Sequence, residues 1–118
     1  MSIYDEANDA FERGEMEGVK EILAPNASLG DPEAQAALGS FLTLSPDPER
    51  FVEGVEWLRS AADAGDGVAA HNLATILLSG GPGVEADCEE AMRYLQRARD
   101  SGFEAMVASG ETGSFAIS

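Results

Sequence analysis

The sequence repeats one pattern of small and apolar residues, and this repeat constrains the fold more than any other feature. In the first half of the pattern, residues recur at an offset of 35 positions: Ala34 and Ala69, Leu38 and Leu73, Leu42 and Leu77. In the second half the offset is 37 positions: Trp57 and Tyr94, Leu58 and Leu95, Ala61 and Ala98. The spacing within each half indicates a pair of amphipathic helices. One such pair cannot bury its apolar face by itself, so the copies are expected to stack on one another.

Six helices are expected from the spacing of apolar residues and from the residues that begin and end helices. Their ranges are 4–13, 16–24, 32–44, 49–64, 68–79 and 88–101. The expected N-caps are Asp31, Asp66 and Asp87. Gly65 and Gly102 are placed to end the helices before them. Pro25 is expected to end the second helix, because proline has no N–H with which to continue the backbone ladder.

These helices predict an all-α superhelix, or solenoid, of about three helical hairpins. Residues 1–108 are predicted to form one helical repeat domain, made of a degenerate hairpin (1–29) and two repeats (30–65 and 66–106). Residues 104–108 have the composition to begin a further helix, and residues 109–118 are predicted to be a flexible tail. The two residues by which the offsets differ fall in the turn at 80–83, where an insertion costs little.

Two segments have the spacing of a known repeat. The segment Ala34-Gln35-Ala36-Ala37-Leu38-Gly39 has the pattern Ala-Gln-x-x-Leu-Gly. The segment from Gly83 to Gly102 has the pattern Gly-Val-x-x-Asp-x-x-x-Ala-x-x-Tyr-Leu-x-x-Ala-x-x-x-Gly. Together they resemble the two halves of the Sel1-like repeat, a relative of the tetratricopeptide repeats. The resemblance implies a right-handed α-α superhelix that acts as a non-catalytic adaptor or scaffold and binds proteins or peptides on its concave face.

The sequence is strongly acidic, with 22 Asp and Glu against seven Lys and Arg and a net charge of −15. Such a surface repels nucleic acids and anionic membranes, which argues against both as partners. It would speed association with a basic protein, but acidity also keeps a protein in solution, and both interpretations stay open. Two alternatives to an adaptor follow. One is an acidic immunity- or antitoxin-type inhibitor of a basic effector protein, and the other is a structural homodimer joined through an exposed apolar end.

The residue types that catalysis and metal binding need are scarce. His71, the single histidine, falls in the middle of a repeat helix, and with the single cysteine, Cys88, it cannot supply a zinc site. The turn at 80–83 lacks the Gly-Lys-Ser/Thr ending of a phosphate-binding loop. We therefore predict no enzymatic activity, no cofactor and no metal. The first residues lack a secretory signal pattern, and no apolar run has the length of a bilayer, so a cytoplasmic location is expected.

Helical spacing places Ala36, Ser40, His71 and Thr75 on the side of each first helix that lies opposite its apolar stripe, with Thr43 and Leu78 alongside. The resemblance implies that this side lines the binding groove, so these six residues are the predicted binding site. These side chains are small or weakly polar, whereas most acids fall on the second helices and the loops. The sequence thus predicts a groove that is nearly uncharged and selects its partner by shape. An ordinary surface histidine is the alternative interpretation of His71.

Overall fold

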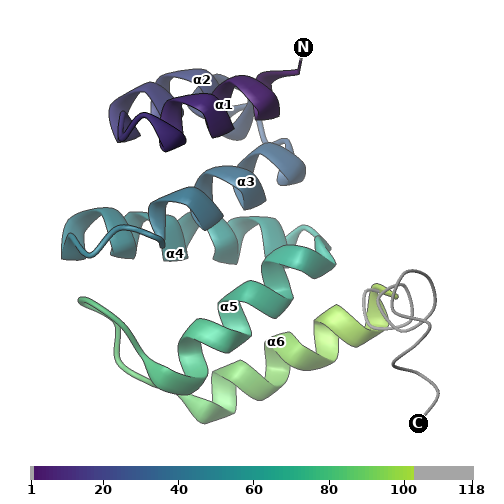
Figure 1. Ribbon diagram of the computed structural model, residues 1–118. Helices are drawn as coiled ribbons and strands as arrows, with labels where there is room; N and C mark the ends of the chain where they lie inside the picture. The colour runs from purple at the N-terminus through teal and green to yellow at the C-terminus, as the bar shows by residue number, and fades with distance from the viewer. Residues whose placement is uncertain (1, 103–118) are drawn as a thin grey trace, which may run out of the picture.

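Six helices stacked as three hairpins make up the part of the chain, residues 2–102, that the computed structural model describes (Figure 1). The helices are α1 (Ile3–Glu12), α2 (Met16–Ser28), α3 (Pro32–Leu42), α4 (Pro48–Asp63), α5 (Gly67–Ser79) and α6 (Cys88–Asp100). Between residues 2 and 102 the β-structure is limited to an isolated bridge between Gly81 and Val84. The all-α solenoid is therefore confirmed. The helix expected at 104–108 and the tail at 109–118 lie outside the described residues.

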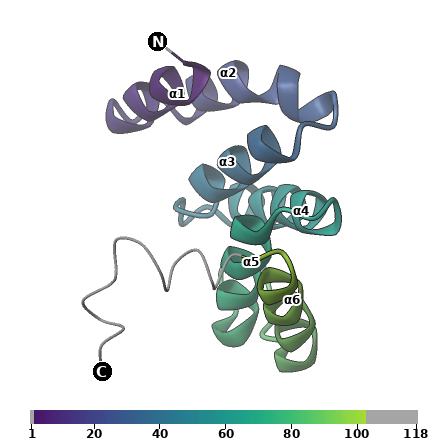
Figure 2. The same cartoon turned by 90° about the vertical axis from the view of Figure 1, so that its right-hand side faces the viewer.

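The two helices of each hairpin lie on opposite faces of the stack (Figure 2). We call the face formed by α1, α3 and α5 the first-helix face, and the face formed by α2, α4 and α6 the second-helix face. Across residues 2–102, no helix combines the length and the apolar character that crossing a membrane requires.

Aspartate side chains fix where the helices of both repeats begin. The Asp31 carboxylate accepts a hydrogen bond from the N–H of Glu33 (3.1 Å), and the Asp66 carboxylate accepts one from the N–H of Ala69 (2.9 Å). Asp87 caps α6 in the same way, so all three predicted N-caps are confirmed. Asp47 also caps α4, with Pro48 in the first turn, where its missing N–H costs nothing. This cap was not among those expected from the sequence.

The prediction that Pro25 ends the second helix is wrong. Helix α2 continues through Pro25 to Ser28. Pro25 is exposed, so the backbone hydrogen bond that it removes is lost on the solvent side of the helix. The extra turn places Ala27 in the core, where it is 1% exposed. The buried side chain of Gln35 donates a hydrogen bond from Nε2 to the Ala27 carbonyl (3.0 Å), which also accepts one from the N–H of Gly30 (3.0 Å).

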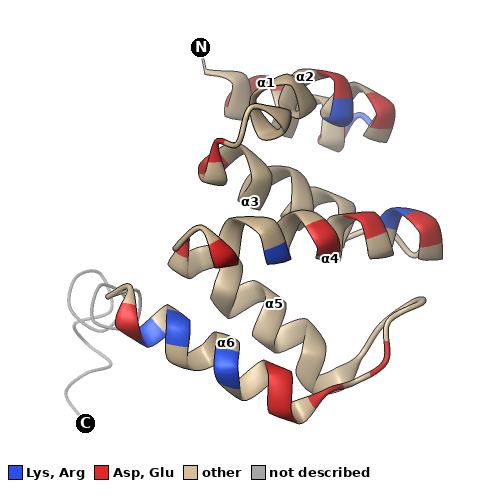
Figure 3. Ribbon diagram, turned by 180° about the vertical axis from the view of Figure 1, so that it is seen from behind, with Lys and Arg blue, Asp and Glu red and all other residues tan. Residues whose placement is uncertain are grey.

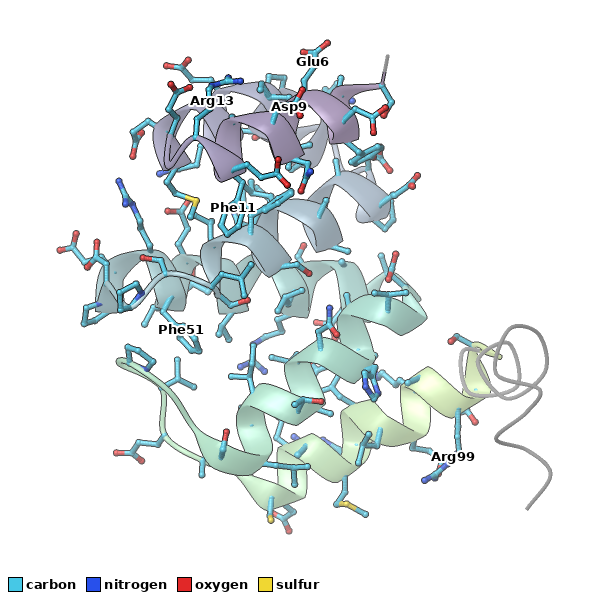
Figure 4. All side chains as sticks on the ribbon, viewed as in Figure 1. Glu6, Asp9, Phe11, Arg13, Phe51 and Arg99 are labelled. Carbon is cyan, nitrogen blue, oxygen red and sulfur yellow. The ribbon has the colours of Figure 1, made fainter. Side chains whose placement is uncertain are left out.

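The predicted apolar stripes form two adjoining hydrophobic cores. The first lies between α1, α2 and α3 and contains Ala7, Ala10, Val19, Leu23, Ala27, Ala34, Leu38 and Leu42. The second lies mainly between α4, α5 and α6 and includes Phe51, Val55, Leu58, Leu73, Leu77, Ala91, Tyr94 and Ala98. Phe11 lies between α1 and α3, with its ring centroid 5.2 Å from that of Phe41 (Figure 4). Because each core draws on two hairpins, the hairpins cannot separate without exposing apolar surface.

Helices α3 and α4 cross in direct backbone contact. A Cβ atom on Gly39 would lie 2.7 Å from the Gly54 carbonyl oxygen, and a Cβ on Gly54 would lie 2.8 Å from the Gly39 carbonyl oxygen. Two small residues therefore allow this close approach, one on each helix. The repeat offsets place Ala74 and Ala91 at the same crossing of α5 and α6, and both are fully buried.

Candidate functional site

Two adjoining pockets lie on the first-helix face. The Tyr4 pocket is lined by Tyr4, Glu33, Ala36, Ala37, Ser40, Asp66 and Val68. The His71 pocket is lined by Ser40, Thr43, Leu44, His71, Asn72, Thr75 and Ile76. Their volumes are about 500 and 450 Å³, and Ser40 lines both. We refer to these two adjoining pockets together as the groove, which follows α3 and α5 and reaches α1 at the end where these helices begin.

Most polar side chains of the His71 pocket already form hydrogen bonds within or between α3 and α5. The Thr43 hydroxyl donates to the Ser40 carbonyl (3.1 Å), and the Thr75 hydroxyl donates to the His71 carbonyl (3.0 Å). Asn72 donates from Nδ2 to the Ser40 hydroxyl (3.2 Å), which ties α5 to α3 across the groove. Such a surface offers shape and modest polarity to a partner, with little charge.

Five of the six predicted site residues line these pockets. Ala36 and Ser40 line the Tyr4 pocket, while Thr43, His71 and Thr75 join Ser40 in the His71 pocket. Leu78 lines neither pocket and is 48% exposed near the end of α5. His71 is exposed at the rim of the groove. The geometry brings the five residues together, and their role in binding stays a prediction.

The Tyr4 pocket contains residues that sequence reasoning missed. Tyr4 comes from α1, and its position over α3 depends on how two hairpins stack, which no local pattern reveals. Glu33 and Ala37 could have been found, because they lie one helical turn from Ala36 and Ser40 on the same side of α3. Asp66 was recognised only as a helix cap.

The charge of the groove differs between its two halves. The expectation of a nearly uncharged groove holds for the His71 pocket and is wrong for the Tyr4 pocket, which Glu33 and Asp66 line. Acids gather there because α3 and α5 begin there, where carboxylates cap free amides and offset the helix dipole. The pKa of Tyr4 is raised by its burial and then by the nearby carboxylates of Glu33 and Asp31.

The basic residues lie mostly on the opposite side of the molecule. Six of the seven are on second helices: Lys20, Arg50, Arg59, Arg93, Arg97 and Arg99 (Figure 3). Several of them pair with acids of a neighbouring second helix, as Lys20 does with Glu53 (3.1 Å) and Arg50 with Glu17 (3.2 Å). Helices α1, α3 and α5 contain no lysine or arginine. Among residues 2–102, no ion pair joins a carboxylate of α1 or α3 to a lysine or arginine.

Between residues 2 and 102, few side chains of the kinds that bind metals lie close together. No group of three or more His, Cys, Asp and Glu side chains in this range could hold a metal ion. Cys88 is a free, exposed thiol in the first turn of α6.

Comparison with protein families gives one match. The Sel1 repeat model matches residues 32–66 and 67–103, which together are more than half of the chain. The matched ranges coincide with α3–α4 and α5–α6, the two hairpins that carry most of the groove. No curated protein and no solved structure is significantly similar to the chain.

Proposed function

Because this chain belongs to the Sel1 repeat family, whose members are generally protein-interaction modules, we propose that it is an adaptor or scaffold that binds a protein or peptide in the groove of its first-helix face. The observation that carries the proposal is that the Tyr4 and His71 pockets adjoin at Ser40 and together draw on three first helices. The small side chains of Ala36, Ala37 and Ser40 leave room for side chains of a partner.

The proposal is tested by placing a bulky side chain in the groove. Thr75→Arg fills the His71 pocket, and Ser60→Arg adds the same side chain at an exposed position of α4 on the opposite face. We expect affinity capture from the host lysate, followed by mass spectrometry, to yield a partner with the wild type and Ser60→Arg but not with Thr75→Arg. A partner that both variants retain would contradict binding in the groove.

A second candidate function is inhibition of a basic effector protein, as by an immunity or antitoxin protein. It is favoured by the net charge of −15 and by acids of α1 such as Glu6 and Asp9, which point away from the body of the molecule (Figure 4). In this mode the partner is basic, binds through the acidic surface and is released by salt, since at 1 M the Debye length falls to ~3 Å. A partner that survives 1 M salt and depends on Thr75 would favour the groove instead.

A homodimer is the third candidate, and exposed apolar residues of the last hairpin favour it. Leu78 on α5 is 48% exposed and Met92 on α6 is 57% exposed. Light scattering measures the solution mass directly. A dimeric mass that Met92→Glu converts to a monomeric one would support this candidate, and a monomeric wild type would contradict it.

A further inference from the structure

We propose that the Tyr4 pocket binds an arginine or lysine side chain of the partner, with the charged end between the carboxylates of Glu33 and Asp66. The inference rests on the proposed function and deepens it, because it assigns a chemical class to the segment that enters the groove. The shape of the pocket, the charge of its lining residues and the ring of Tyr4 all support this assignment.

The floor of the pocket suits the aliphatic part of a long basic side chain. Ala36, Ala37 and Val68 present methyl groups to a cavity of about 500 Å³. Arginine and lysine bury their methylene chains against such surfaces while their charged ends stay near water. Val68 is 44% exposed, so a side chain that covers it removes apolar surface from solvent.

The charge of the pocket selects a cation. Glu33 is exposed, and its carboxylate forms no ion pair with any residue between 2 and 102. Asp66 uses one oxygen, Oδ1, to accept from the N–H of Ala69. An anion would have to compete for the amides at the starts of α3 and α5, which Asp31 and Asp66 already cap. With the described bases lying elsewhere, the local field favours a positive group.

Tyr4 adds an aromatic ring of the kind that attracts cations. The molecule already contains the same combination on its other face. There the Tyr94 ring lies 5.9 Å from the guanidinium of Arg59 and 5.4 Å from that of Arg97, and Arg97 also pairs with the Asp63 carboxylate (2.9 Å). The Tyr4 pocket likewise has a tyrosine and carboxylates, and in the proposed complex the partner supplies the cation.

The test uses a matched pair of short synthetic peptides as probes. One is acetyl-Gly-Ala-Arg-Ala-Gly-amide, and the other carries citrulline, which has nearly the shape of arginine without its charge. Each is titrated into the full chain labelled with ¹⁵N, and amide shifts are followed by NMR. We expect saturable shifts at Ala36, Ala37 and Val68 with the arginine peptide and none with the citrulline peptide.

Three variants that each remove one carboxylate charge complete the test. Glu33→Gln alters the pocket, and Asp66→Asn does so while keeping a side chain that caps helices well. Glu56→Gln makes the same change at an exposed position of α4 on the second-helix face. We expect each pocket variant to weaken the arginine peptide about three-fold, as for a partly exposed ion pair, and the control to leave it unchanged.

Three outcomes would overturn the inference: no shifts at the pocket, equal binding of both peptides, or equal weakening by Glu56→Gln. None of them would overturn the proposed function, which is tested by the loss of the partner in Thr75→Arg. Conversely, the arginine peptide could bind the pocket while Thr75→Arg still captured the partner. That result would support cation binding in the Tyr4 pocket and contradict binding of the partner in the groove.

Discussion

At the scale of single residues, the direct backbone contact between α3 and α4 depends on two glycines. Gly39 and Gly54 bring the backbones of α3 and α4 together, and each lacks room for even one methyl group. Gly18 in α2 differs, because a Cβ there would have its nearest neighbour at 3.5 Å, an ordinary contact. Glycine inside a helix lowers stability relative to alanine, so its use at 39 and 54 reflects packing rather than helix propensity.

Gly39→Ala is therefore expected to lower the free energy of unfolding by about 1–3 kcal/mol, since the new methyl group meets backbone that can move only with its helix. Gly18→Ala is the matched control and is expected to be neutral or to stabilise the chain by up to about 1 kcal/mol. Urea unfolding followed by circular dichroism measures both. If Gly39→Ala were as stable as Gly18→Ala, the close crossing of α3 and α4 would be wrong.

Two tyrosines give the stability of the chain a pH dependence in the alkaline range. The pKa of Tyr94 is raised by its burial and by the hydrogen bond that its hydroxyl donates to Asp63 (3.0 Å), and the pKa of Tyr4 is raised chiefly by burial. A raised pKa in the folded state means that the unfolded chain loses its proton first as pH increases. The stabilisation is thus fully present below pH 10 and is lost as pH rises through the folded-state values.

We expect the unfolding free energy of the wild type to fall as pH rises above 10, and Tyr94→Phe to reduce the slope of that fall. At neutral pH the same variant is expected to cost about 0.5–1.5 kcal/mol, the net value of one hydrogen bond. Denaturant unfolding at a series of pH values gives both numbers. Tyr4→Phe gives the contribution of the other tyrosine. If neither variant changed the slope of unfolding free energy against pH, the pH dependence would belong to other groups.

At the scale of helices, α2 shows how tertiary packing can override a local stop signal. Pro25 removes a backbone donor, but Ala27 and the hydrogen bond from Gln35 hold the following turn in place. Helices α3 to α6 begin at aspartate caps, and α4, α5 and α6 end shortly before glycines such as Gly65, whose φ is +101°. Alanine cannot adopt this left-handed conformation without strain, which explains glycine at the end of a helix.

The continuity of α2 predicts that Pro25→Ala stabilises the chain by roughly 1–3 kcal/mol, because it restores a helical hydrogen bond at an exposed position. Pro32→Ala is the matched control. Pro32 lies in the first turn of α3, where its N–H would have no helical partner, so little change is expected. Thermal unfolding compares the two. A destabilising Pro25→Ala would mean that α2 is not continuous in solution.

At the scale of the whole molecule, charge is divided between the two faces. The second-helix face holds six of the seven bases, several in ion pairs between neighbouring helices, whereas α1 and α3 carry acids without bases and α5 carries neither (Figure 3). Exposed ion pairs contribute little to stability, and a net charge of −15 opposes compaction through self-repulsion. We therefore expect the repulsion among the acids to change stability more than the exposed ion pairs do.

Added salt is accordingly expected to stabilise the free protein. The melting temperature should rise as NaCl increases from near zero to about 0.5 M, since screening weakens the repulsion among the acids. Differential scanning calorimetry measures it, with KCl as a second salt to separate screening from ion-specific effects. A melting temperature that falls with both salts would show that the ion pairs outweigh the repulsion.

Local signals in the sequence determined the hairpins of this protein. The recurrence of Leu38 at Leu73, the aspartate caps and the glycines after helices each act within one or two turns, so they can be read without knowing the fold. The same spacing placed Ser40, Thr43, His71 and Thr75 on one side of their helices, and they do share a pocket.

Tertiary structure alone decided how the hairpins meet. It brought Tyr4 of α1 beside Glu33 and Asp66, and with them gave one half of the groove a negative charge that the sequence pattern did not show. It also carried α2 through Pro25 and matched Gly54 to Gly39. The physical reason is the same in each case. These contacts join residues from different helices, and their geometry follows from the burial of whole helix faces, which no single helix specifies.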